Sequence, residues 1–214
     1  MNFQFFSKVV LCGSSTVGKT TIFSRIVNNH ADLETKSTTG ASFASVQYEY
    51  QNQVLNINLW DTAGQEEYRS LVNIYFRESN AVLIIFDLTN HKSFEDVDVW
   101  IDQIYANCGE PLPAIIIVGN KSDLEDLRQV PHEEINIFSQ NSKLPYYEVS
   151  AITGENINLL MENVAAISFK SINLAKTQSK SIIKIVDIKT DSNSKLALAK
   201  DNNAQSDFET RKCC

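Results

Sequence analysis

Hydrophobic positions in this chain alternate between short continuous runs and longer stretches at helical spacing. Continuous apolar runs are typical of strands in a parallel sheet covered on both faces, and they occur at residues 81–87 and 114–119. Residues 5–12 (FFSKVVLC) also predict a strand. Period-two alternation on both sides of Gln51-Asn52-Gln53 predicts a β-hairpin from residues 42–50 and 54–60. Amphipathic helices are predicted at 19–28, 93–107, 133–140 and 155–171, and a last short strand at 146–149.

This alternation of strand and helix predicts an α/β fold. We expect a mostly parallel six-stranded sheet with one antiparallel edge strand and helices on both faces. The pattern ends near residue 173, so residues 1–173 are predicted to form one domain. The composition of residues 174–214, rich in Lys, Ser, Asn, Asp and Ala, predicts a flexible tail. Its one apolar cluster, Ile182 to Ile188, either docks on the domain or forms a short helix.

Charge and composition narrow the function classes. The net charge is −7, with −10 in residues 1–173 and +3 in the tail, and no long basic stripe is present. This charge argues against nucleic-acid binding. It fits a protein whose acidic domain stays in solution while its mildly basic tail lies near anionic lipid. No apolar run approaches the roughly 18–20 residues that span a bilayer, and the N-terminal segment lacks the features of a signal peptide. We therefore expect a cytosolic protein.

The segment GSSTVGKT, residues 13–20, fits the phosphate-loop pattern G-x-x-x-x-G-K-[ST] between a predicted strand and a predicted helix. Glycines let successive N–H groups point at phosphate oxygens, and the following helix adds its positive N-terminus. Lys19 would pair with the β- and γ-phosphates, and the Thr20 hydroxyl would bind Mg²⁺. The expected nucleotide contacts are Ser15, Thr16, Val17, Gly18, Lys19 and Thr20. This loop alone leaves a nucleotide kinase open.

The segment WDTAGQE, residues 60–66, carries the expected metal and γ-phosphate side. Asp61 stands at a strand end, where a carboxylate can reach the Mg²⁺ of a phosphate loop. Gly64 lets its N–H approach a γ-phosphate, and Gln65 has the donor and acceptor needed to position an attacking water, so it is the predicted catalytic residue. Thr38, in a polar loop upstream, is expected to add a second hydroxyl to the metal.

The segment NKSD, residues 120–123, follows a buried strand and would face the ligand crevice. The Asp123 carboxylate can accept from guanine's N1–H and exocyclic amine, a donor pair that adenine lacks. Asn120 would brace the loop, and the stem of Lys121 would lie over the base. Ser150 and Ala151 end the last strand, where the Ala151 N–H would donate to the guanine carbonyl.

Together these segments resemble the Ras superfamily of small GTPases, and the Rab family in particular, over about residues 5–172. The Rab resemblance rests on Trp60, on Tyr68 to Leu71, on Tyr75-Phe76-Arg77 and on the Cys213-Cys214 pair. Residues 40–43 (GASF) are similar to the endosomal branch of Rabs. The resemblance implies the P-loop NTPase fold, GTP or GDP with Mg²⁺, and slow hydrolysis without an activator. It also implies an exchange factor, an activating protein, a GDP-dissociation inhibitor or escort protein, and effectors.

Three positions depart from the Rab pattern. Ala31 stands where an aromatic residue usually covers the guanine, and Leu33 would substitute poorly. Ile152 replaces the Lys of the family's SAK segment, and Thr39 replaces an Ile that follows the switch Thr. The first two predict looser nucleotide binding, and the third alters the hydrophobic effector surface.

The chain contains four cysteines, of which Cys12 is expected to be a buried core thiol. The Cys213-Cys214 pair does not fit C-a-a-X, and it resembles the double-cysteine segment that Rab prenylation machinery modifies with two geranylgeranyl groups. One lipid chain binds membranes marginally and two hold stably.

The resemblance implies a switch that regulates vesicle-mediated traffic on the cytoplasmic face of an intracellular membrane, with an endosome among the candidates, and that cycles through the cytosol. A pseudo-GTPase binding module held in one state is the alternative. Ala31 and Ile152 favour that alternative slightly, while the residues that oppose it are Lys19, Thr20, Asp61 and Gln65. The NKSD segment and the lack of a recognisable acceptor site or lid argue against the kinase.

Overall fold

The computed structural model describes residues 5–32, 38, 40–62 and 74–173. Its six strands form one sheet in the order β2-β3-β1-β4-β5-β6. The strands are β1 (Phe5–Cys12), β2 (Ala41–Tyr50), β3 (Gln53–Thr62), β4 (Ala81–Asp87), β5 (Ala114–Asn120) and β6 (Tyr146–Val149). Only the β2–β3 pair is antiparallel, and β2 lies at the edge of the sheet, as the sequence predicts.

The order of the strands indicates where a ligand would bind. The chain winds from β1 to β3 on one side, and β4 then pairs with β1 on the other side. In open α/β sheets ligands bind outside the carboxyl ends of the strands at such a reversal. The phosphate loop follows β1 directly, and NKSD begins at the last residue of β5. The topology therefore brings the predicted phosphate and base segments to one end of the sheet.

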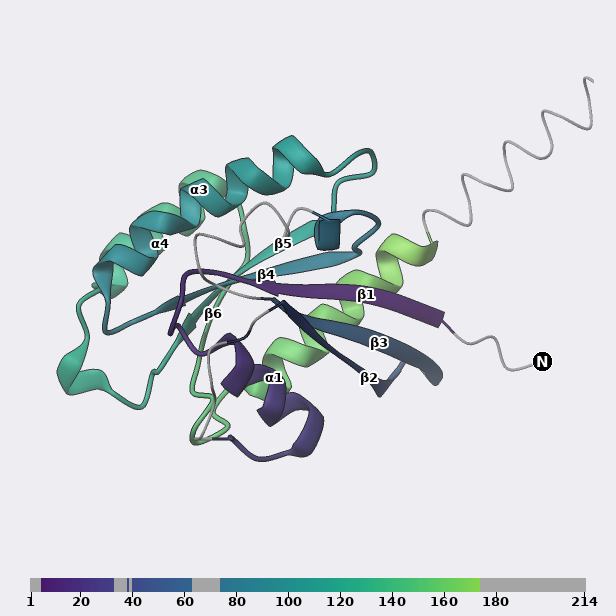
Figure 1. Cartoon of the computed structure of the whole chain (residues 1–214), viewed down its shortest axis with the longest axis horizontal. Helices are drawn as coiled ribbons and strands as arrows, with labels where there is room; N and C mark the ends of the chain where they lie inside the picture. Colours follow the sequence, from purple (N-terminus) through teal and green to yellow (C-terminus); the bar gives the residue numbers. More distant parts are fainter. Residues whose placement is uncertain (1–4, 33–37, 39, 63–73, 174–214) are drawn as a thin grey trace, which may run out of the picture. The chain divides into compact units, whose positions relative to one another are not determined.

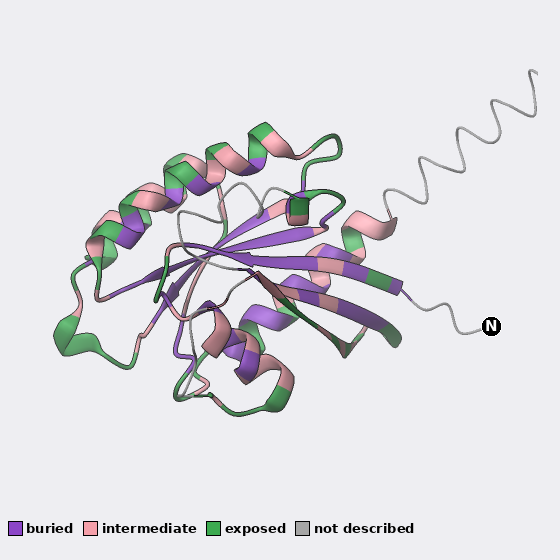
Figure 2. Ribbon diagram, in the orientation of Figure 1, coloured by how far each residue is buried: buried purple, intermediate pink, exposed green. Residues whose placement is uncertain are grey.

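The sheet separates two hydrophobic cores. Helix α1 (Lys19–Asn28) and the helical residues 157–173 cover one face through Ile22, Leu160 and Val164. Helices α3 (His91–Asn107) and α4 (His132–Ser142) cover the other face through Trp100 and Ile135 (Figure 1). The central strands are buried on both sides, and all seven residues of β4 are buried (Figure 2). These layers fix the strands whose carboxyl ends carry the predicted site residues.

The structure moves the ends of several predicted elements by one or two residues. Helix α3 begins at His91 rather than residue 93, because the Asn90 side chain accepts a hydrogen bond from the Lys92 N–H and caps the helix. The last helix occupies 157–173 rather than 155–171. The turn between β2 and β3 consists of Gln51 and Asn52, both with positive φ, and Gln53 already belongs to β3.

Residues beyond 173, including the predicted tail and its apolar cluster, lie outside the described part of the chain. Among the described residues, no helix is long and apolar enough to cross a membrane.

Candidate nucleotide-binding site

The phosphate loop connects the end of β1 to the start of α1. Gly18 precedes α1 with a φ of 94°, and a Cβ there would lie 2.3 Å from Nδ2 of Asn120. Glycine is therefore required at this position by both conformation and space. Thr16 also has a positive φ, 65°, which is unusual for a β-branched residue. The loop thus holds one strained residue beside the predicted phosphate contacts, a form of strain that clusters at functional sites.

Lys19 is buried beneath this loop. Its ammonium donates to the carbonyl oxygens of Gly13, at 2.9 Å, and Ser14, at 2.7 Å. Burial lowers the pKa of Lys19 to about 8, while the nearby Asp61 carboxylate raises it. An anionic phosphate would stabilise the charged form in the same place. The side chain is thus held at the loop that sequence reasoning assigned to phosphate.

Three oxygen-bearing side chains from separate segments converge beside Lys19. The Thr20 hydroxyl donates to Oδ2 of Asp61 at 2.7 Å and lies 2.9 Å from the Thr38 hydroxyl. Thr38 in turn lies 3.5 Å from Asp61 Oδ2. Asp61 is buried, and its Oδ1 has no hydrogen-bond partner within the described part of the chain. Buried polar atoms are almost always partnered, so this carboxylate oxygen and the two hydroxyls fit a hard cation such as Mg²⁺.

The base-recognition loops are tied to the phosphate loop through Asn120. Its Nδ2 donates to the Val17 carbonyl at 2.8 Å, and its Oδ1 accepts from the Ala151 N–H at 3.1 Å. One buried side chain therefore sets the spacing between the phosphate loop, β5 and the loop after β6. This bracing role is the one that the sequence predicted for Asn120.

Asp123 and Lys121, on the base side of the site, are also positioned by partners. The Ser150 hydroxyl donates to Oδ1 of Asp123, which fixes the carboxylate and leaves it lone pairs for a base. Lys121 has a φ of 71°, and its ammonium pairs with Oδ2 of Asp87 at 2.6 Å. Anchoring the ammonium on β4 holds the aliphatic stem that was expected to lie over the base.

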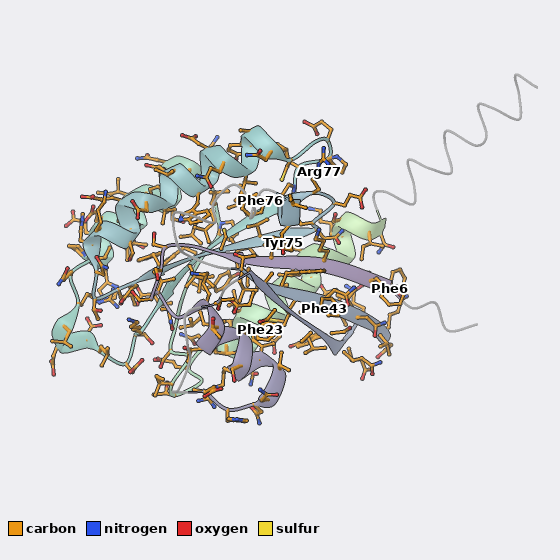
Figure 3. The ribbon with its side chains drawn as sticks, in the orientation of Figure 1. Phe6, Phe23, Phe43, Tyr75, Phe76 and Arg77 are labelled. Carbon is orange, nitrogen blue, oxygen red and sulfur yellow. The ribbon has the colours of Figure 1, made fainter. Side chains whose placement is uncertain are left out.

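An aromatic patch lies on β2, β3 and the residues before β4. The ring centroid of Trp60 is 5.0 Å from that of Phe43 and 5.4 Å from that of Tyr75. Figure 3 labels Phe43 and the Tyr75-Phe76-Arg77 segment. Phe76 is buried in the core, whereas Phe43 is 54% exposed. An exposed aromatic of this size beside two others offers a hydrophobic contact surface.

The structure also describes two of the departures from the Rab pattern. Ala31 is partly buried and lies three residues beyond the end of α1, and Ile152 is 45% exposed in the loop after β6. Several predicted site residues lie outside the described residues, namely Leu33, Thr39, Gly64, Gln65, Tyr68 to Leu71, Cys213 and Cys214.

Comparison with known proteins identifies the family. The sequence model described as "Ras family" matches residues 8–170. The chain belongs to the Ras family. It is 35% identical over 170 residues to Ras-related protein rab-11.1 of Caenorhabditis elegans, covering 79% of this chain and 80% of that protein. It is 36% identical over 162 residues to Ras-related protein Rab-11A of Dictyostelium discoideum, covering 76% and 75%. It is 34% identical over 178 residues to human Ras-related protein Rab-25, covering 83% of each.

These relatives confirm the predicted Rab resemblance, the fold class and the activity. This Rab is a GTPase, a switch that binds and hydrolyses GTP and regulates membrane traffic. Ras-family GTPases in general bind GTP or GDP with Mg²⁺ and work with exchange factors, activators and effectors.

Sequence reasoning missed three residues that shape the Rab site. Asp87 ends β4, and its place at the carboxyl end of a central strand was an available signal. Asp96 accepts from the Ser14 hydroxyl at 2.8 Å and ties α3 to the phosphate loop. Arg25 reaches the loop after β6 from α1, a contact across 126 residues that no local pattern indicates.

Proposed function

We propose that this Rab GTPase holds GTP or GDP with Mg²⁺ in the crevice at the carboxyl ends of its strands, and that it acts at an endosomal membrane. The observation that carries the proposal is the convergence of Thr20, Thr38 and Asp61, in which the buried Oδ1 of Asp61 has no hydrogen-bond partner among the residues that the structure describes. Thr38 and Asp61 belong to the two segments that flank a γ-phosphate in switch GTPases.

Each side chain has a distinct part in this proposal. Thr20, Thr38 and Asp61 hold the cation, which when bound neutralises charge on the β- and γ-phosphates. Lys19 exchanges its carbonyl partners Gly13 and Ser14 for phosphate oxygens. The remaining nucleotide contacts are Ser15, Thr16, Val17, Gly18, Gly64, Asn120, Lys121, Asp123, Ser150 and Ala151.

Gln65 is the proposed catalytic residue, because its side chain can orient the attacking water as acceptor and donor. Because Thr38 and Gly64 belong to segments that the γ-phosphate would order, hydrolysis would release them and end the signal.

Regulation and partner binding follow the family pattern. We infer an exchange factor, an activating protein and a GDP-dissociation inhibitor or escort protein as partners, because the named relatives are Rabs. Effectors would contact the aromatic patch of Phe43, Trp60 and Tyr75. Its packed rings come from β2, from β3 and from the segment before β4. Aromatic residues are enriched at interaction hot spots.

Membrane attachment would come from prenyl groups on Cys213 and Cys214. The body of the molecule carries a net charge of −10 and the tail +3, so charge alone cannot anchor the protein to anionic lipid. Similarity to Rab-11 and Rab-25 proteins, together with residues 40–43, supports the endosomal branch.

A timed assay of phosphate release tests the catalytic part of this proposal. Gln65→Leu should lower GTP hydrolysis at least tenfold and leave GTP affinity nearly unchanged, because the side chain orients water and does not hold the ground state. Gln140→Leu, which removes an exposed amide on α4, is the matched control and should hydrolyse at the wild-type rate. Equal rates for wild type and Gln65→Leu would contradict the role of Gln65. A wild type that binds GTP but releases no phosphate, with or without activator, would indicate a pseudo-GTPase.

A further inference from the structure

Arg25 connects helix α1 to the loop that follows β6. Its Nε donates to the Ala151 carbonyl at 2.8 Å, one terminal nitrogen donates to the Ile152 carbonyl, and the other donates to the Asn29 carbonyl at 3.1 Å. Its guanidinium also lies against Gly154, where a Cβ would be 3.9 Å from Cζ. A single planar fork therefore fixes two successive peptide groups of this loop to the end of α1.

Those peptide groups adjoin the one that would read the base. In this structure the Ala151 N–H donates to Oδ1 of Asn120 at 3.1 Å. In the proposed site it would also donate to the guanine carbonyl, and its direction depends on how the backbone of residues 150–152 is held. Asn120 restrains this loop through the Ala151 N–H, and the Ser150 hydroxyl ties it to Asp123. Arg25 adds a separate restraint through the carbonyls of Ala151 and Ile152. Bonds from a charged donor are about twice as strong as neutral ones.

The same helix also carries the phosphate contacts. Helix α1 begins with Lys19 and Thr20, and Arg25 lies in its last turn. One rigid element thus joins the phosphate end of the site to the base end. Ile152 has an uncharged side chain. Among the described residues, Arg25 is the cation that binds the carbonyls of Ala151 and Ile152.

We propose that Arg25 is a positioning residue for guanine recognition, which holds the Ala151 N–H on the guanine carbonyl and thereby slows nucleotide release. This inference rests on the proposed base site. It predicts a specific loss: recognition at the 6-position of the base should weaken when Arg25 is removed, while recognition of the exocyclic amine by Asp123 should persist.

The test uses the full-length chain with three nucleotides. GDP is compared with 6-thio-GDP, whose sulfur is a weak acceptor, and with IDP, which lacks the exocyclic amine. Release of fluorescent GDP from Arg25→Ala should be about tenfold faster than from wild type, equivalent to about 1.4 kcal/mol. Arg25→Lys, which can reach fewer carbonyls, should lie between them, and Arg77→Ala is the matched control for loss of an exposed arginine. The preference for GDP over 6-thio-GDP should fall at least threefold in Arg25→Ala, and the preference for GDP over IDP should stay within twofold.

Three results would overturn the proposal. Unchanged GDP release in both Arg25 variants would remove the positioning role. An equal fall in both preferences would mean that Arg25 only supports the fold in general. A wild type that distinguishes GDP from neither analogue would overturn the base site itself, and with it the role of Arg25, whereas a wild type that distinguishes both leaves the base site standing whatever the variants do.

Discussion

At the scale of single residues, the phosphate loop contains one residue whose backbone conformation its own side chain disfavours. Thr16 has a φ of 65°, a region that glycine occupies without a steric penalty. A β-branched side chain there costs about 1–3 kcal/mol, which the surrounding structure must offset. The strain is therefore a residue-level property that substitution can relieve.

Thr16→Gly should raise the stability of the GDP-bound protein by about 1 kcal/mol, because relief of strain exceeds the greater entropy of glycine in the unfolded chain. That gain corresponds to a melting temperature roughly 2–4 °C higher for a chain of this size. Ser15→Gly is the matched control, because the φ of Ser15 is not positive, and it should give no gain. Equal shifts in the two variants, measured by thermal unfolding with saturating GDP, would argue against strain at Thr16.

The missing aromatic cover of the base is the second residue-level feature. Ala31 follows the end of α1, and an aromatic stack contributes roughly 1 kcal/mol beyond buried area. Ala31→Phe should therefore slow dissociation of fluorescent GDP about fivefold in excess Mg²⁺. His30→Phe places the same ring one residue away, on an exposed position, and should leave the rate unchanged. Unchanged or faster release from Ala31→Phe would mean that the base is already covered.

At the scale of elements, the hydrophobic pattern predicts the strands and helices well because burial drives it directly. The fully buried run of β4 and the alternation of β2 and β3 each have one simple structural reading. Helix boundaries are less predictable, because they depend on caps such as Asn90. Its side chain accepts a hydrogen bond from the Lys92 N–H, which the hydrophobic pattern does not indicate. The contacts of Arg25, Asp87 and Asp96 are tertiary, so their partners are absent from any local window.

The residues of the candidate site were likewise predictable only where a local sequence pattern specifies them. Motif residues such as Lys19 and Asn120 could be predicted because their chemistry requires fixed spacing along one loop. The partners that orient them could not, because several sheet topologies would place different side chains against the same loop. The bond from Asn120 to Val17, across 103 residues, exists only once β4 pairs with both β1 and β5.

Helices α3 and α4 are joined by an ion pair that should respond to pH. Nε2 of His91 lies 3.0 Å from Glu134, and Nδ1 lies 3.4 Å from Glu95. The hydrogen bond to Glu134 raises the pKa of His91, with a further contribution from Glu95. The stability that this pair adds is therefore fully present below the unfolded pKa of about 6.5, and it is lost as pH rises through the raised folded pKa.

Glu134→Gln should accordingly lower the free energy of unfolding more at pH 6 than at pH 8.5. The difference should be less than about 1 kcal/mol, because the pair is partly exposed to solvent. Glu133→Gln removes a neighbouring exposed carboxylate and serves as the control. Denaturant unfolding at the two pH values measures the difference, and an identical loss at both would exclude a contribution from charged His91.

At the scale of the whole molecule, charge and lipid predict where the protein resides. The negative body is repelled by anionic membranes, and two prenyl groups hold a protein where one gives marginal binding. Cys213→Ser alone should leave partial or misplaced membrane association. Cys213→Ser combined with Cys214→Ser should release the protein to the cytosol while GTP binding persists.

Fractionation of cells that express each variant measures this prediction, and mass spectrometry of the peptide after Lys212 reads the modification directly. Cys108→Ser removes a thiol from the domain and is the control, which should stay on membranes. Free thiols at positions 213 and 214 in protein purified from native membranes would contradict prenylation. The apolar cluster Ile182 to Ile188 would then be the next candidate for the membrane anchor.

The two cores on opposite faces of the sheet also bear on how such a sequence can change over time. Along β4, Leu83 and Ile85 belong to the core under α1, while Val82, Ile84 and Phe86 belong to the core under α3. Substitutions in separate cores share no packing partners, so their effects on stability should add, whereas those within one core should depend on each other. Adjacent positions in the chain are thus free to change independently in evolution, whereas residues as distant as Leu83 and Val164 belong to one core and should constrain each other's substitutions.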